Sequence, residues 1–529
     1  MKRFLPTAAM LLVVALVATS CASAPGATTP SGSQAAAAKP KPGGTIRYGL
    51  VRDPIHFDPA VSAGQSSVSL QGSVYDGLVE YNDQGKLIGA LAESWETPDP
   101  TTYVFKLRKG VTFHDGSTFD AEDVIATLNR IKDPKTAAPQ GPFVSSFSTM
   151  TATDPYTVRI TLPKPNVTFL DRFVGDSNST MFMASAADIA SGFDFRKKTN
   201  GTGAFMLTTW EPGGQYVFKK NPKYWKTGQP YLDEMIQVVI PDDKARVNAL
   251  RSGEVDYVEN VPWQELATLD KFDTYPYSVS WVMVRLNSGK APLDNKKVRQ
   301  ALNFIVDRNE VMQLAFGGKY SIIDGPLQQQ GNAFYWKELE GTYKKDWAKA
   351  TALLAEAGYK TPADVPAMEF SVFSTFAAHN DPAQVLIKQF QTFGLKVNFK
   401  AIDVATLNAN RSSGNYQMQM DGLSFSGPDP DNLRAFFHST AVGHALAAKF
   451  KNDRLDQLLT QGSETTNVDQ RRAIYKEAEQ IILDEAPWVF LLWRPTAEAA
   501  AKYVKGYIVV PGGLGGQNFG RWEYVWLDK

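Results

Sequence analysis

Cysteine and surplus charge are what this sequence lacks most clearly. Cys21 is the only cysteine among 529 residues, so neither a disulfide framework nor a zinc finger can form. The 55 Lys and Arg residues balance 55 Asp and Glu residues, whereas a nucleic-acid-binding protein needs a clustered excess of positive charge. The 43% of apolar residues is ample for packed cores. We therefore expect a globular protein of roughly two to four domains that binds no nucleic acid.

The motifs of several enzyme classes are also absent. The sequence contains no Gly-x-x-x-x-Gly-Lys-Ser/Thr loop, so any ATP hydrolysis linked to its function requires a partner. Its five histidines include no His-Glu-x-x-His pair, and it has no Gly-x-Ser-x-Gly nucleophile turn. We expect no cofactor, no metal site and no catalytic residue.

The N-terminus has the layout of a secretory signal. Lys2 and Arg3 precede an apolar run over residues 4–18, and small residues then lead into Cys21. A membrane-spanning helix is the alternative, but the run is shorter than the roughly 20 residues that a bilayer requires. We expect residues 1–20 to be a signal peptide and the mature chain to be exported.

The single cysteine stands directly after these small residues, and its position resembles the lipobox at which lipoproteins are acylated. An unmodified cysteine of a signal peptide is the alternative. Residues 22–42 are almost entirely Ala, Ser, Thr, Gly, Pro, Gln and Lys, so they have no aromatic or large aliphatic side chain to bury. We expect residues 21–42 to be a flexible tether, reaching on the order of 25 Å, which is anchored to the membrane by lipid on Cys21.

The rest of the chain alternates strand and helix patterns. Alternating apolar residues predict a strand over 102–108, and apolar spacing of three to four predicts a helix over 121–131 with Asp120 as its N-cap. The same helical spacing recurs further on, and Gly358 and Gly394 suit the ends of two of these helices. The further predicted elements are helices over 295–306, 347–357, 384–393 and 471–483, and a strand over 395–399. The fold class is therefore α/β.

Five sequence blocks resemble a known family. The family 5 extracytoplasmic solute-binding proteins, which are peptide, dipeptide and nickel receptors of ABC importers, share blocks of this kind in the same order. The resemblance extends over roughly residues 43–529. The blocks are LAESWE with YVFKLRKGVTFHDG (91–96 and 103–116), AEDV (121–124), GTG with NPKYW (201–203 and 221–225), VRQAL (298–302) and DPDN (429–432).

The resemblance implies a type II periplasmic-binding-protein-like fold. Such proteins have two lobes around a cleft, a hinge of two strands and an extra small α/β domain. By motif position, the hinge strands would cross between the lobes near 285–292 and 495–502. The implied parts are lobe I (43–76, 201–288 and 499–529), domain II (77–200) and lobe III (289–498).

The same resemblance implies the partners. A monomeric receptor would bind a small molecule or short peptide between its lobes and deliver it to the permease and ATPase subunits of an ABC importer. Its place would be outside the cytoplasm, in the periplasm if an outer membrane is present. It would not be an enzyme.

The resemblance also points to a ligand-binding segment in lobe III. In peptide-binding relatives, an aspartate at the position of Ser426 receives the α-ammonium group of the ligand, and a neutral hydroxyl does not provide that charge-assisted bond. Asp421 and Asp429 are the alternative anchors. The candidate ligand-binding residues of this segment are Gly422, Ser424, Phe425, Ser426 and Asp429.

Five further residues are candidates for ligand contact. Asp53 lies where relatives contact ligand, and a turn-capping role is the alternative. Phe143 follows Pro142 in a loop that the family directs toward the cleft, and a place in a core is its alternative. The tryptophans near the expected cleft or hinge are Trp263, Trp281 and Trp493.

The ligand class stays open at this point. Peptides are favoured, and oligosaccharides or other neutral organic solutes follow, because sugar rings stack on tryptophan. A nickel chelate or an opine-like solute is a further alternative. From other functional classes, a secreted hydrolase and a chemosensory or chaperone role without transport remain as alternatives.

Overall fold

A computed structural model describes residues 39–54, 56–61, 65–174, 181–318, 320–328, 332–424, 429–508 and 521–529. The expected signal peptide, Cys21 and nearly all of the tether lie outside these residues. Within the described residues, no helix is both long enough and apolar enough to cross a bilayer.

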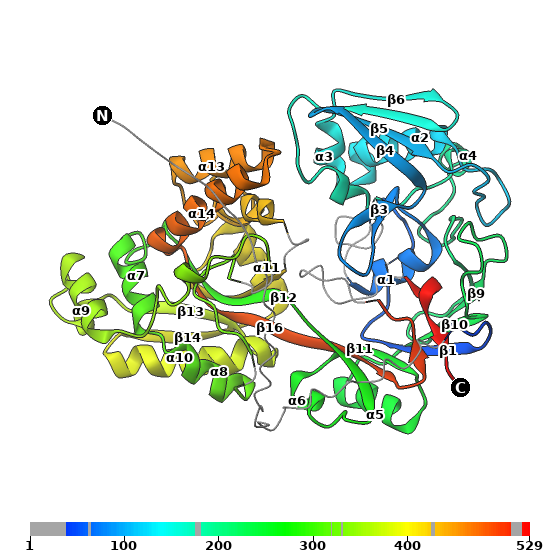
Figure 1. Ribbon diagram of the computed structural model, residues 1–529. Helices are drawn as coiled ribbons and strands as arrows, with labels where there is room; N and C mark the ends of the chain where they lie inside the picture. Colours follow the sequence, from blue (N-terminus) through cyan, green and yellow to red (C-terminus); the bar gives the residue numbers. More distant parts are fainter. Residues whose placement is uncertain are drawn as a thin grey trace, which may run out of the picture. The chain divides into compact units, whose positions relative to one another are not determined.

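One mixed sheet of ten strands runs through the part of the chain from Pro40 to Lys529 (Figure 1). The strands are, in sheet order, β14 (Val397–Ile402), β13 (Met368–Phe373), β15 (Met418–Ser424), β12 (Phe272–Leu286), β16 (Trp488–Ala501), β11 (Tyr257–Val261), β1 (Thr45–Leu50), β10 (Glu234–Val239), β9 (Gln215–Lys220) and β8 (Phe205–Trp210). The central strands are the most deeply buried, and the edge strand β14 buries only Val397 and Ile402.

Two long antiparallel strands, β12 and β16, connect the two halves of this sheet. From Ser280 to Leu286, β12 pairs with β15 on the lobe III side, and Ala497 to Ala500 of β16 pair with β11 on the lobe I side. The expected crossing near 285–292 is therefore wrong: the chain passes into the sheet of lobe III by Ser280. The reason is that the turn containing Pro292 follows β12 and only precedes the first helix of lobe III.

Helices pack against the lobe III strands in two hydrophobic clusters. Val282 and Val284 of β12 belong to one cluster, and Trp281 and Met283 belong to the other, as the alternation of a strand requires. The first cluster includes side chains of α7 (Lys296–Ile305), α8 (Arg308–Phe316), α9 (Trp347–Glu356) and α10 (Ala377–Phe393). The second includes side chains of α12 (Arg434–Phe437), α13 (Asp453–Glu464) and α14 (Val468–Glu485).

Helix α10 begins seven residues earlier than the apolar spacing predicts. It starts at Ala377 rather than 384 and carries Pro382 inside its first turns. A proline at this sixth position of α10 removes the N–H that would bond to the Ala378 carbonyl one turn earlier, so the helix contains Pro382 at the cost of one intrahelical hydrogen bond. The predicted stop is confirmed, because Gly394 has a φ of 108° at the end of α10.

Domain II has its own sheet and core. The predicted strand and helix are confirmed as β5 (Thr102–Leu107) and α2 (Ala121–Lys132), and Asp120 caps α2 as expected. The neighbouring strands are β4 (Ala92–Asp99), β7 (Thr157–Thr161) and β6 (Thr149–Asp154), and two short strands are β2 (Val79–Tyr81) and β3 (Leu87–Gly89). The further helices of this region are η1 (Pro134–Thr136), α3 (Gly141–Ser145), η2 (Leu170–Phe173) and α4 (Ala186–Ser191).

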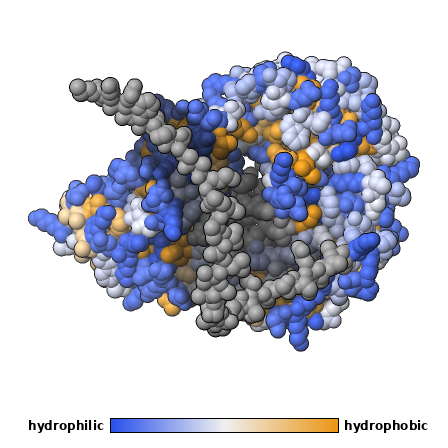
Figure 2. Space-filling view, in the orientation of Figure 1, coloured by the Kyte–Doolittle hydropathy of each residue, from blue (hydrophilic) through white to orange (hydrophobic). Residues whose placement is uncertain are grey.

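Lobe I completes the sheet with β1 and its neighbours, and the two ends of the folded part meet here. Lys41 forms an ion pair with Asp528 at 2.5 Å, so the start of the described chain is fixed beside its C-terminus. The helices are α1 (Gln65–Val74), α5 (Asp243–Ser252) and α6 (Trp263–Leu266). On the face shown in Figure 2, hydrophobic residues form only small patches among hydrophilic ones.

Candidate functional site

Three adjacent strands place several of the predicted site residues side by side. Trp281 of β12 lies opposite Leu423 of β15 on one side and opposite Trp493 of β16 on the other. One residue along, Val282 lies opposite Gly422. The structure therefore brings Gly422, Trp281 and Trp493 together at the centre of the sheet.

The two tryptophan side chains are buried, so they offer no exposed ring surface on which a ligand could stack. Trp281 is fully buried, and its indole N–H donates to the Pro326 carbonyl at 3.2 Å. Trp493 is 6% exposed, and its N–H donates to the Gln328 carbonyl at 3.0 Å. Because the ring centroids lie 5.9 Å apart, each indole fixes the position of the other.

Trp493 also lines a cavity of about 1050 Å³ in lobe III. Arg308 lies at this cavity but is buried, and its guanidinium is bonded to carbonyl groups that include those of Tyr343 and Phe490. Three lysines, Lys337, Lys344 and Lys345, contribute positive charge to the lining. The cavity is large enough for a small organic molecule.

Asp421, one of the two alternative ammonium anchors, is engaged by arginines. Arg411 donates to its carboxylate at 2.6 and 3.1 Å, and Arg285 lies 3.4 Å away. Burial alone would raise the pKa of Asp421, but the two guanidinium groups hold this pKa below its ordinary value. Asp421 has a fully buried side chain and is an ionised carboxylate whose partners lie inside the protein.

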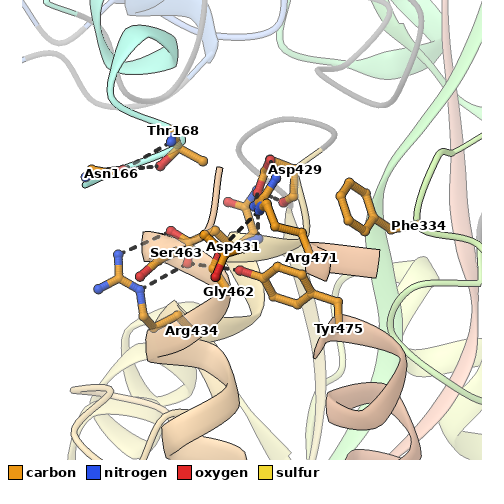
Figure 3. Close-up of polar contacts among 12 residues, drawn as sticks. Asn166, Thr168, Phe334, Asp429, Asp431, Arg434, Gly462, Ser463, Arg471 and Tyr475 are labelled. Carbon is orange, nitrogen blue, oxygen red and sulfur yellow. Dashed lines mark hydrogen bonds and ion pairs between the residues drawn. The ribbon is translucent and has the colours of Figure 1, made fainter. Parts of the chain in front are cut away.

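Asp429, the other alternative, is engaged in the same way. Arg471 of α14 donates to both carboxylate oxygens of Asp429, at 2.8 and 2.9 Å (Figure 3). The neighbouring Asp431 accepts from Arg434 at 3.2 Å and from the Tyr475 hydroxyl at 3.3 Å. Neither alternative aspartate is therefore available to a ligand ammonium group in this structure.

The opposite face of the same strands carries a different set of polar groups. Gly422 faces His379 of α10: the Nε2 atom of His379 lies 3.0 Å from where a Cβ atom on Gly422 would be. Arg494 follows Trp493 in β16, and its guanidinium lies 5.7 Å from the centre of the Phe376 ring. Neither His379 nor Arg494 was predicted from the sequence, because neither belongs to a recognisable motif. The one available signal was that Arg494 directly follows the predicted residue Trp493, whereas His379 adjoins no predicted residue.

The remaining predicted residues lie elsewhere or outside the described part. Asp53 accepts hydrogen bonds from the Gly213 backbone N–H at 2.8 Å and the Tyr216 hydroxyl at 2.7 Å, which fixes the turn between β8 and β9. The backbone of Ser424 ends β15, but its side chain, Phe425 and Ser426 lie outside the described residues. A ligand role for these residues stays a prediction.

Phe143 and Trp263 each pack against other aromatic rings. Phe143 of α3 lies 5.0 Å from the Phe147 ring, in the core of domain II. Trp263 of α6 lies 6.0 Å from the Phe316 ring of α8, so it joins the region after β11 to lobe III. The structure does not bring either residue to the group formed by Gly422, Trp281 and Trp493, and their ligand role also stays a prediction.

Comparison with known proteins gives a consistent picture. Residues 86–444 match the family described as bacterial extracellular solute-binding proteins, family 5, middle region. The chain is 29% identical to heme-binding protein A of Haemophilus influenzae over 512 residues, which cover 90% of this chain and 92% of that protein. It is 28% identical to the glutathione-binding protein GsiB of Pectobacterium atrosepticum over 479 residues, which cover 87% of this chain and 90% of that protein.

Solved structures resemble the fold over nearly its whole length. The binding protein AgaA of A. tumefaciens R10, solved with agropinic acid, superposes with a TM-score of 0.80 at 29% identity and covers 92% of this chain and 99% of its own. The periplasmic binding protein DppA of Helicobacter pylori, solved with the peptide STSA, has a TM-score of 0.76 at 24% identity and the same two coverages. The type II binding-protein fold expected from the sequence is confirmed.

Proposed function

Because the chain belongs to the bacterial extracellular solute-binding proteins of family 5, we propose that it is the receptor of an ABC importer, which captures a peptide-like solute by lobe closure and delivers it to the permease. The observation that carries the proposal is the family match over residues 86–444, together with relatives whose names describe binding of heme and glutathione. These ligands are organic molecules of moderate size. The receptor itself performs no covalent chemistry.

The two-strand connection supports capture by closure. β12 and β16 are the strands that link lobe I to lobe III in the sheet, and a connection of two strands allows a hinge motion that a broad interface would resist. Ligand binding would then shift an equilibrium between open and closed forms, because a closed form contacts the ligand from both sides.

A direct contact between domain II and lobe III would favour the closed form. Lys164 forms an ion pair with Glu464 at 3.0 Å, and the Val167 N–H donates to the Ser463 carbonyl at 3.1 Å. Figure 3 shows the segment with Asn166 and Thr168 facing Ser463 and Gly462 of lobe III. We call these two interactions the latch. An opening movement about β12 and β16 would break them.

The anchor belongs to the same proposal. The sequence up to Cys21 supports export and acylation, and the tether would keep the receptor near the permease. Nothing else in the chain is needed for membrane attachment, since a lipid on Cys21 places the folded part within reach of the membrane surface.

A thermal-shift screen tests the proposal. The panel contains short peptides, glutathione, cello- and manno-oligosaccharides and nickel chelates. A ligand present at 100 times its Kd stabilises the folded state by about 2.7 kcal/mol, which is readily seen as a higher melting temperature. We expect peptides or glutathione to stabilise the protein unchanged. Stabilisation by sugars alone would contradict the peptide-like ligand, and turnover of a bound compound would contradict the receptor.

A further inference from the structure

The segment 164–173 of domain II lies against lobe III. It contains the domain II half of the latch, and it ends in the short helix η2. Arg172 of η2 lines a cavity of about 280 Å³ together with lobe III residues that include Asp431 and Arg434. η2 therefore faces lobe III directly. The space that remains between them is typical of a contact between domains that opens and closes.

Asp171 is the acid group of η2 at this contact. The Tyr81 hydroxyl of β2 donates to its carboxylate at 2.5 Å. The charged groups that act on it are Arg172, its neighbour in η2, and Asp429 and Arg471 of lobe III. Asp171 is therefore a domain II carboxylate that meets a carboxylate of lobe III.

Lobe III gathers its own carboxylates at this place. Asp429 caps the short helix η5 (Pro430–Leu433), and it accepts from the Asp431 N–H at 2.9 Å. Arg471 donates to both carboxylate oxygens of Asp429, so its positive charge is already shared when domain II approaches (Figure 3). Carboxylates that are brought together favour the binding of a proton by one of them.

The proton affinity of Asp171 reflects this contact. Burial raises its pKa, the Tyr81 hydroxyl opposes this, and Asp429 raises the pKa further than Arg172 or Arg471 lowers it, to about 6. In an open form, water would replace lobe III beside η2, so the effects of burial and of Asp429 would both decrease. The pKa of Asp171 would then lie closer to the ordinary value of 3.8.

We propose that closure of domain II on lobe III is coupled to protonation of Asp171, so that an acidic medium favours the closed receptor. This proposal rests on the proposed function, which includes lobe closure, and adds a regulation of that closure. The closed form holds the proton more tightly and therefore gains population as the pH falls. The gain is complete near the pKa of the open form and is lost as the pH rises through about 6.

Other acid groups with a raised pKa lie away from this contact. The pKa values of Asp76 and Asp123 are also raised by burial to about 6, but Asp76 accepts from Thr202 and Asp123 from the Ala186 N–H, neither of which belongs to lobe III. Closure onto lobe III therefore leaves their surroundings unchanged.

One histidine does lie at the contact. His438 lines the same cavity as Arg172, and its Nδ1 atom is 3.9 Å from Asp456. Because histidine is the side chain that changes charge most readily near neutral pH, its contribution needs a variant of its own.

Distances between two spin labels test the proposal on the mature protein without a ligand. Cys21 is the only cysteine, so Cys21→Ser with Thr151→Cys in domain II and Val468→Cys in lobe III carries one label at each exposed position. Pulsed electron spin resonance of this parent protein measures the closed and open populations at pH 5.0 and pH 7.5. We expect the ratio of closed to open protein to be about 3- to 10-fold higher at pH 5.0.

Variants assign the effect to Asp171. Asp171→Asn is uncharged and keeps an acceptor for Tyr81, so its closed fraction should be the same at both pH values and should match that of the parent at pH 5.0. Asp171→Ser should behave in the same way if the first variant does not fold. Asp83→Asn is the matched control, because Asp83 is an exposed aspartate of domain II, and it should keep the pH dependence. His438→Asn should keep it as well.

The latch variant extends the measurement. If the parent is closed at both pH values, Lys164→Glu brings its open form into the measurable range, and its closed fraction should again be higher at pH 5.0. A closed fraction that is independent of pH in both proteins would overturn the proposal. A pH dependence that survives in Asp171→Asn or Asp171→Ser would overturn it too.

The failures of the two proposals are distinguishable. A closed fraction that is independent of pH leaves solute binding, which the thermal-shift panel measures, unaffected. A protein that closes at acidic pH but binds no member of that panel would contradict the receptor function and leave the coupling to Asp171 intact.

Discussion

At the scale of single residues, ion pairs decide which groups remain available to a ligand. Asp421 and Asp429 are the only aspartates in the described residues of segment 421–430, and both accept hydrogen bonds from an arginine. A carboxylate that already accepts hydrogen bonds from an arginine has few oxygen lone pairs free for a ligand ammonium group. The residue types of a motif therefore mislead unless their partners are known.

Asp421→Asn should strongly destabilise the fold. It leaves Arg285, which is fully buried, with an uncompensated charge, and breaking one partner of a buried pair costs about 3–5 kcal/mol. Urea unfolding followed by tryptophan fluorescence measures the loss. Asp453→Asn is the matched control, since Asp453 is 78% exposed and its loss should change stability little. Equal stability of the two variants would contradict the role assigned to the buried pair.

Glu479 should make stability depend on pH. It is buried in α14 and accepts from the Leu327 N–H, and burial, opposed by this bond, raises its pKa to about 8. Because the folded state holds this proton more tightly than the unfolded state, the stabilisation is complete below about pH 4.5 and is lost as pH rises toward 8, by up to about 1.4 kcal/mol per pH unit.

Glu479→Gln removes the titrating group and should flatten this part of the stability profile. Melting temperatures of both proteins between pH 5 and pH 8.5, in one buffer series, provide the comparison. A decline of the same size in the variant would show that another group is responsible.

At the scale of elements, helices and strands whose apolar residues recur with a regular period could be predicted from the sequence, whereas isolated side-chain contacts could not. The spacing of Val124, Leu128 and Ile131 predicted α2, and all three side chains are buried. The start of α10 was predicted at 384 and lies at Ala377, because the polar residues Asn380 and Asp381 and the proline Pro382 interrupt the apolar spacing in its first turns. Arg494 and His379 come together from strands and helices that are far apart in the sequence, so no local pattern reports their proximity.

The latch connects two structural elements and should change the affinity of the protein for its solute. Lys164→Glu places two carboxylates together and should weaken solute binding by about two- to fivefold, the effect of a partly exposed ion pair on the closed form. The exchange Lys164→Glu with Glu464→Lys should restore affinity, because it rebuilds the pair with the charges reversed. Calorimetry at low and high salt measures the affinity for the solute in the unchanged protein, in the single variant and in the exchange variant. An equal effect of salt on these three affinities would contradict a latch.

At the scale of the whole molecule, the motif blocks were sufficient for the fold. The family resemblance gave the type II architecture because the blocks follow each other over most of the chain, and residues 86–444 match the family. The position of the first crossing was wrong because it depends on strand pairing: Ser280 already lies opposite Ser424. Pairing of distant strands is a property of the folded chain rather than of local spacing.

The membrane attachment is a whole-molecule prediction of its own. Cys21→Ser should release the receptor from the membrane fraction and leave the folded part unchanged, because residues 22–42 have no aromatic or large aliphatic side chain to insert. Fractionation of cells and a mass spectrum of the N-terminal peptide provide the readouts. A Cys21 that carries no lipid in the native protein would contradict the anchor.

The most direct test of the receptor account is small-angle X-ray scattering of the mature protein during titration with the probe that stabilises it most. We expect the radius of gyration to fall as the ligand saturates the protein, and we expect Lys164→Glu to shift this transition to higher ligand concentration. Saturation seen by calorimetry with an unchanged radius of gyration would contradict capture by lobe closure.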